Sequence, residues 1–128
     1  MKFKELDNPV EVFNDLVYQC KGKHWIKKAY ILAWTSYKNN NWKYDGATFV
    51  REHNNNYWEV AAFIHDWLNH EGYVGKEVDL YFIKIMIALN YSANLIFERA
   101  KWMQWTFLNV FWHKIKRNYK GSKLPNYL

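Results

Sequence analysis

The chain has 128 residues, a formal net charge of +6 and a hydrophobic fraction of 50%. This length corresponds to one domain with a substantial core, and an aromatic fraction of 20% excludes an intrinsically disordered chain. Because Cys20 is the single cysteine, no internal disulfide can form, which excludes a disulfide-stapled secreted miniprotein.

The excess of basic over acidic residues favours anionic partners, although a Lys-rich solvated surface explains this excess equally well. The first residues lack the apolar stretch of a signal peptide, and no run of about 20 apolar residues occurs. We therefore expect a protein that is made in the cytoplasm without export and that has no transmembrane helix.

Residues 1–50 are predicted to form an N-terminal segment with short strands. A short amphipathic helix is expected before Gly22 breaks the pattern. Residues 24–44 are rich in aromatic and β-branched side chains such as Trp25, Ile31 and Thr35, and three asparagines at 39–41 are a turn signal. This pattern indicates one or two strands, with a helix over 27–33 as the alternative.

Residues 51–120 are predicted to be a helical core, followed by an irregular tail at 121–128. Asn56 and Glu59 resemble a capping box, so a helix should begin near Tyr57 and end at Gly72. A second helix is expected over 76–90. The short connection between them predicts an antiparallel pair.

A third, long amphipathic helix is expected from the N-cap Ser92 to about Arg117. One apolar stripe along it consists of Ile96, Ala100, Met103, Phe107 and Val110. The predicted fold class is therefore α+β, mainly α: one domain over 1–128, with a small N-terminal β element, an antiparallel helix pair and a long C-terminal helix.

His65 and Asp66 form a titratable pair within an apolar helical segment. Such groups are unfavourable there unless they are hydrogen-bonded or bind a ligand. Adjacent helical positions point about 100° apart, so the two side chains cannot bond each other well. Asp79 on the facing helix is the expected partner of His65. One histidine with two carboxylates suits general-base or metal-assisted hydrolysis, and equally suits a purely structural buried histidine.

Three motifs carry a resemblance to a known family. They are Tyr-Asp-Gly-Ala-Thr (residues 44–48), Ala-Ala-Phe-Ile-His-Asp-Trp-Leu (residues 61–68) and Val-Asp-Leu-Tyr-Phe (residues 78–82). In this order and spacing the chain resembles the domain-of-unknown-function-1353 family of short phage and prophage proteins. The resemblance covers about residues 42–90, and it implies a location in the host cytoplasm or a virion, with virion or other phage proteins as partners.

The His-Asp helix and the Asp-x-x-Phe helix are also similar to the core of phospholipase A₂ enzymes. That resemblance implies His65 as the base that activates water and Asp79 as the acid that orients it. It further implies Asp66, with Asp45 in the preceding loop, as ligands of calcium, which takes six to eight oxygens. Two positions depart from this plan: the loop has a single glycine, Gly46, and Asn69 stands where a tyrosine is expected.

Because the loop differs, we expect a phage accessory or virion-associated protein with a structural role in preference to catalysis. The alternative is a calcium-dependent lipid or ester hydrolase. A metal phosphohydrolase of the His-Asp type is the third hypothesis, with His24, His53 and His70 as available ligands.

Aromatic and basic residues gather near the C-terminus. Trp102, Trp105 and Trp112 form a stripe that is interpreted as a protein interface or core, with a lipid anchor as the alternative. The basic residues of 114–120 suit the negative end of a helix dipole. An anionic membrane surface is thus a possible partner, and specific nucleic-acid binding is not expected.

Overall fold

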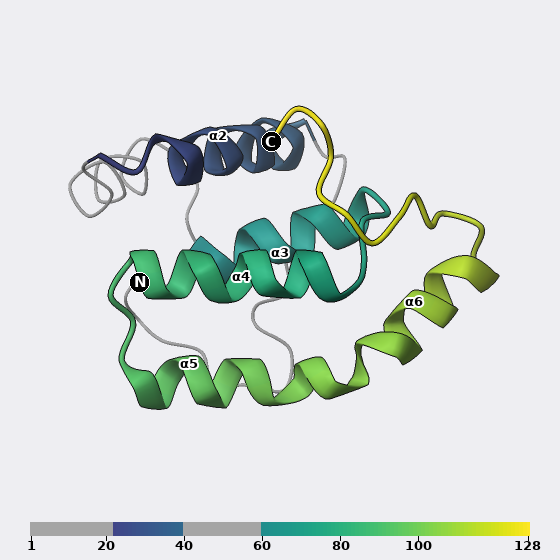
Figure 1. The fold of residues 1–128 in the computed structure, drawn as a ribbon. Coiled ribbons are helices and arrows are strands. Elements are labelled where there is room, and N and C mark those ends of the chain that lie inside the picture. Colours follow the sequence, from purple (N-terminus) through teal and green to yellow (C-terminus); the bar gives the residue numbers. More distant parts are fainter. Residues whose placement is uncertain (1–21, 40–59) are drawn as a thin grey trace.

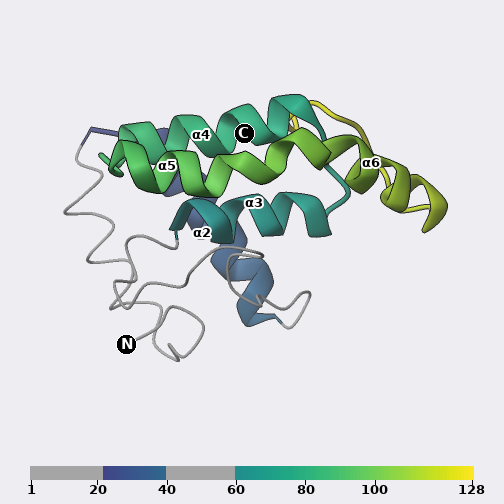
Figure 2. The same ribbon diagram turned by 90° about the horizontal axis from the view of Figure 1, so that it is seen from below.

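The computed structural model describes residues 22–39 and 60–128, and every regular element within these two ranges is helical. The elements are α2 (His24–Lys38), α3 (Val60–His70), α4 (Lys76–Ala88), α5 (Ala93–Ala100), the 3₁₀-helix η3 (Lys101–Trp105) and α6 (Thr106–Ile115). Helix α3 packs between α2 and α4, α5 packs on α4, and α6 projects at one end of the molecule (Figures 1 and 2).

The predicted β element is wrong in the region that the structure describes. Residues 24–38 form α2, so the fold of the described ranges is all-α and not α+β. The buried side chains of α2 recur every three or four positions, namely at Ile26, Ala29, Tyr30, Ala33 and Trp34. This helical spacing outweighs the strand preference of the individual residues, because it places one continuous apolar face on the core. The other predicted parts of 1–50 lie outside the described residues.

The two helices that the sequence predicts on either side of Gly72 are found as α3 and α4. The turn between them contains Gly72 at φ +100°, where a Cβ atom would meet the carbonyl oxygen of Asn118 at 2.2 Å. Only glycine is accommodated in this backbone conformation and at this close approach. The turn therefore returns the chain immediately, and α3 and α4 make the most extensive helix–helix contact in the described structure.

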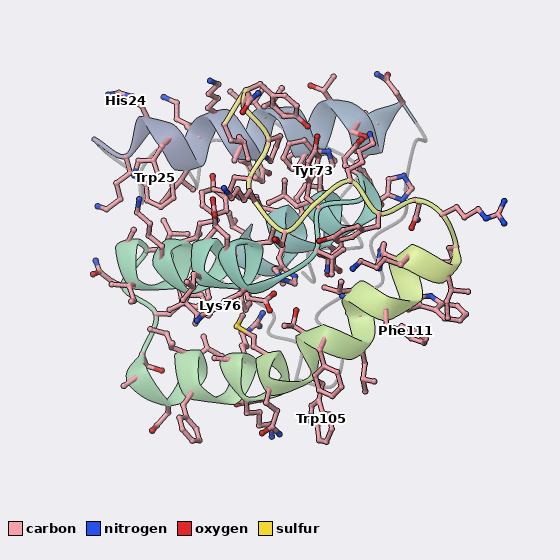
Figure 3. All side chains as sticks on the ribbon, turned by 45° about the vertical axis from the view of Figure 1, so that its right-hand side comes forward. His24, Trp25, Tyr73, Lys76, Trp105 and Phe111 are labelled. Atoms are coloured by element: carbon pink, nitrogen blue, oxygen red, sulfur yellow. The ribbon has the colours of Figure 1, made fainter. Side chains whose placement is uncertain are left out.

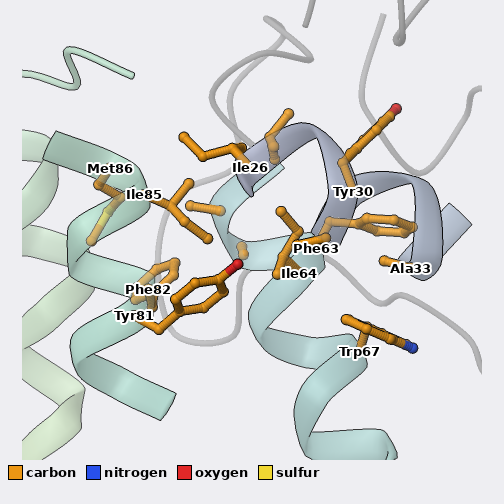
Figure 4. Close-up of a cluster of buried hydrophobic side chains, with 14 of the residues drawn as sticks. Ile26, Tyr30, Ala33, Phe63, Ile64, Trp67, Tyr81, Phe82, Ile85 and Met86 are labelled. Carbon is orange, nitrogen blue, oxygen red and sulfur yellow. The ribbon is translucent and has the colours of Figure 1, made fainter. Parts of the chain in front are cut away.

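The core lies where α2, α3 and α4 meet (Figure 4). Its largest fully buried side chains include Tyr30 and Ile26 from α2, Phe63 from α3 and Met86 from α4. Phe63 lies within ring-contact distance of Tyr30, with centroids 6.1 Å apart. Aromatic side chains on α2 and α3 thus fill the space between these helices, which explains much of the aromatic content of the chain.

The predicted third helix is divided into α5, η3 and α6. Its start is confirmed, because the Ser92 hydroxyl accepts a hydrogen bond from the Leu95 amide at 3.1 Å. The apolar stripe along it does not face one way: Ile96 and Met103 pack against the core, whereas Phe107 is 59% exposed. One straight helix would keep the same face toward the core along its length. The 3₁₀ segment η3 has a different number of residues per turn, so a different face of α6 points toward the core. Helix α5 buries Leu95 and Arg99, and α6 buries His113.

The C-terminal tail, predicted to be irregular, runs back over the α3–α4 turn (Figure 1). The Lys120 amide donates to the Gly72 carbonyl at 2.8 Å, and the Val74 amide donates to the Gly121 carbonyl at 3.0 Å. Tyr73 and Gly121 form an isolated parallel bridge. The tail has no helix or strand, but these backbone bonds fix it to the end of the helix pair.

Candidate active site

Helices α3 and α4 bring His65 and Asp79 together. His65 Nε2 lies 2.7 Å from Asp79 Oδ1, and the two side chains are 18% and 11% exposed. An ionised carboxylate only accepts hydrogen bonds, so the Nε2–H of His65 is the donor. In the neutral ring the other nitrogen, Nδ1, then carries a lone pair. The structure thus contains the His65–Asp79 contact that the sequence predicts, with His65 as the donor and Asp79 as the acceptor.

Helix α4 holds the imidazole with two residues that are three positions apart. Asp79 lies in the first turn of α4, where the positive end of the helix dipole favours a carboxylate. Phe82, on the same face, has its ring centroid 5.0 Å from that of His65. The hydrogen bond and the ring contact together restrict both the position and the rotation of the imidazole.

Asp66 follows His65 on α3 and is partly buried. Successive helical side chains leave the axis about 100° apart, so Asp66 lies off the face that carries His65. Within residues 22–39 and 60–128, no three histidine, cysteine or acidic side chains are grouped so as to hold a metal ion. Asp45, the other predicted calcium ligand, lies outside the described residues.

The histidines considered for a metal phosphohydrolase are not brought together in the part of the chain that can be described. His24 begins α2 and His70 ends α3, and both are exposed. His53 falls outside the described ranges. A pocket of about 440 Å³ lies between Tyr73 and the tail residues 119–126, and neither His65 nor Asp79 lines it.

The predicted tryptophan stripe is not part of the core. Trp105 is 48% exposed and Trp112 is 54% exposed, whereas the side chain of Trp102 is outside what the structure describes. Trp105 and Phe111 project away from α3 and α4 (Figure 3). Trp105 and Trp112 lie instead on the outer face of η3 and α6.

Sequence reasoning missed His113, which is 7% exposed and joins α6 to α3. Its Nδ1 lies 2.9 Å from the carbonyl oxygen of Asn109, and its Nε2 lies 3.1 Å from that of Asn69. A neutral imidazole has one N–H and serves one carbonyl at a time, whereas the protonated ring serves both. The available signal was the position of His113 on the helix face opposite the aromatic residues.

Comparisons of the chain with protein-family models, with curated proteins and with solved structures find no match. The phage-family and phospholipase resemblances therefore stay predictions. Within the described ranges, none of the helices combines the length and the apolar composition needed to cross a bilayer.

Proposed function

We propose that His65 and Asp79 form the general-base centre of an ester hydrolase. The observation that carries this proposal is the 2.7 Å hydrogen bond from His65 Nε2 to Asp79 Oδ1. This bond leaves Nδ1 as the basic nitrogen. It also places the negatively charged carboxylate of Asp79 beside the ring, where it stabilises the protonated imidazole. A base held in one orientation by a carboxylate is the arrangement that general-base catalysis requires.

In this mechanism Nδ1 of His65 takes a proton from water as the water oxygen attacks the ester carbonyl carbon. Asp79 stabilises the imidazolium that forms and keeps the ring from rotating. When the tetrahedral intermediate collapses, the same nitrogen returns the proton to the leaving alcohol. The products are a carboxylic acid and an alcohol, and both ring nitrogens end in their starting protonation state.

The test compares His65→Gln with His70→Gln, because the second variant removes an exposed histidine from the same helix. Turnover of fluorogenic carboxylic esters and of phospholipid is measured for both, with calcium and with a chelator. His65→Gln should reduce turnover by a factor of about 10² or more, because proton transfer contributes that much. His70→Gln should leave it unchanged.

Asp79→Asn is the second variant, because it keeps the shape of the side chain and removes the charge. It should reduce turnover while the circular dichroism spectrum remains that of the wild type. An absence of ester hydrolysis by the wild-type protein, or equal turnover by wild type and His65→Gln, would overturn the proposal.

A second candidate is a non-catalytic accessory protein of a phage, held on a partner surface. The apolar outer face of α6 favours it, because exposed apolar patches mark interaction sites. In that case the His65–Asp79 bond only holds α3 to α4. His65→Gln would then lower the free energy of unfolding, and no ester would be hydrolysed by any variant.

A further inference from the structure

Helix α6 carries its apolar residues on the side that faces away from the protein. Its five large apolar side chains are each more than half exposed: Phe107, Leu108, Phe111, Trp112 and Ile115. At about 100° per residue they cover an arc of about 140°. The opposite face holds the buried His113, with the partly buried Thr106 and Asn109. This orientation reverses that of an ordinary surface helix, whose apolar stripe faces the core.

The segment that carries this face has charges of one sign. The last 28 residues contain six basic residues and no acidic residue, whereas the first 100 residues contain twelve of each. The whole excess of +6 therefore belongs to the segment that includes α6. Its basic residues are Lys101, Lys114, Lys116, Arg117, Lys120 and Lys123.

Two of these lysines border the apolar face. By helical angle Lys114 lies just beyond the edge marked by Phe107, and Lys116 lies just beyond the edge marked by Trp112. Lys116 Nζ is 5.4 Å from the centroid of the Trp112 ring. Long lysine side chains can keep their amines at the polar boundary while the neighbouring rings enter an apolar phase.

We propose that α6 is an interfacial helix that lies in the plane of an anionic lipid bilayer. Phe107, Leu108, Phe111, Trp112 and Ile115 enter the boundary between headgroups and acyl chains, and the flanking lysines contact lipid phosphates. A ten-residue helix spans about 15 Å, which suits a position along the surface and not across the bilayer.

The charge pattern decides between this occupant and a second copy of the chain. Two copies joined through α6 would bring their two basic segments together, and like charges at an interface oppose association. An anionic surface gains from the lysines that border the apolar face. The inference does not depend on the His65–Asp79 centre, because no residue of that pair lies on α6.

The test is sedimentation of the full-length protein with vesicles of phosphatidylcholine alone or with added phosphatidylglycerol. We expect binding to the anionic vesicles that weakens as salt is raised. The double variant Leu108→Ser/Phe111→Ser should bind at least about tenfold more weakly, because two apolar side chains are lost from the interface. Lys114→Gln/Lys116→Gln should bind about thirtyfold more weakly.

The matched control is Ile87→Ser on α4, which removes an apolar side chain that is 62% exposed and lies outside α6. It should bind as the wild type does. Equal sedimentation with neutral and anionic vesicles, or full binding by the Leu108→Ser/Phe111→Ser variant, would overturn the proposal. So would a dimer in analytical ultracentrifugation that this variant converts to a monomer, because a second copy would then cover the face.

Discussion

The imidazole of His65 contacts a side-chain carboxylate on the neighbouring helix, whereas that of His113 contacts two backbone carbonyls, one on its own helix and one on α3. His65 has a carboxylate on Nε2, which leaves Nδ1 available for chemistry. His113 has a backbone carbonyl oxygen beside each ring nitrogen, and the neutral ring can donate to only one of them. His65, whose partner is a carboxylate, is therefore the candidate base. His113, whose partners are two backbone carbonyls, is a structural histidine.

Replacing His113 with alanine should loosen α6 from α3. The variant removes the ring that lies between the Asn109 and Asn69 carbonyls, while the Asn69 carbonyl keeps its hydrogen bond from the Gly72 amide at 3.0 Å. The loss of one such hydrogen bond costs about 0.5–1.5 kcal/mol. Amide hydrogen exchange should become faster across residues 106–115 than in α3 and α4. Lys114→Ala, an exposed change on the same helix, is the control. Equal exchange rates in the wild type and His113→Ala would contradict the role given to this ring.

Tyr81 should make the protein sensitive to alkali. Burial raises the pKa of Tyr81 from 10.0 to about 12, because the charged phenolate is poorly solvated there. Between pH 10.0 and about 12, the Tyr81 hydroxyl is ionised in the unfolded chain but still neutral in the folded protein. The free energy of unfolding is therefore unaffected by Tyr81 below pH 10.0, and it falls as the pH rises from there to about 12. The free energy of unfolding should fall more steeply over this range in the wild type than in Tyr81→Phe. Parallel profiles from denaturant titrations would argue against the burial effect.

At the scale of elements, the helices that could be predicted are those with local signals. Ser92 caps α5 through its own hydroxyl, and Gly72 ends the α3 segment because its backbone requires a glycine. Strands were preferred over the alternative of a helix at α2 because its residues favour strands one by one, while their spacing is helical. Spacing should therefore take precedence over propensity when both are strong.

The α3–α4 turn provides a direct test of how the tail is attached. Gly72→Ala should destabilise the protein by more than about 1 kcal/mol, because the added Cβ meets the Asn118 backbone and the backbone has positive φ. Gly22→Ala is matched in having a positive φ of 82° but has no atom within 4 Å of the added Cβ. Denaturant unfolding should show the larger loss for Gly72→Ala. Equal losses would mean that backbone strain, and not the contact with the tail, sets the effect.

For the whole molecule, the direction of α6 could not be predicted from the sequence. An apolar arc on a helix ordinarily faces the core, and the spacing of the residues does not show that this one faces outward. Its outward direction depends on η3 and on the bond from His113 to Asn69, which are tertiary features without a local signal. The His65–Asp79 pair was predictable, because two buried polar residues on facing helices have few other partners.

The protonation of the His65 ring tests the central claim most directly. Nitrogen-15 NMR of histidine-labelled protein, with the His65 signals assigned from their loss in His65→Gln, locates the ring proton. In the neutral ring we expect the proton on Nε2, where Asp79 accepts it, with Nδ1 unprotonated. A proton on Nδ1, with Nε2 bare beside Asp79, would contradict the account, because the nitrogen assigned as the base would then have no lone pair to accept a proton.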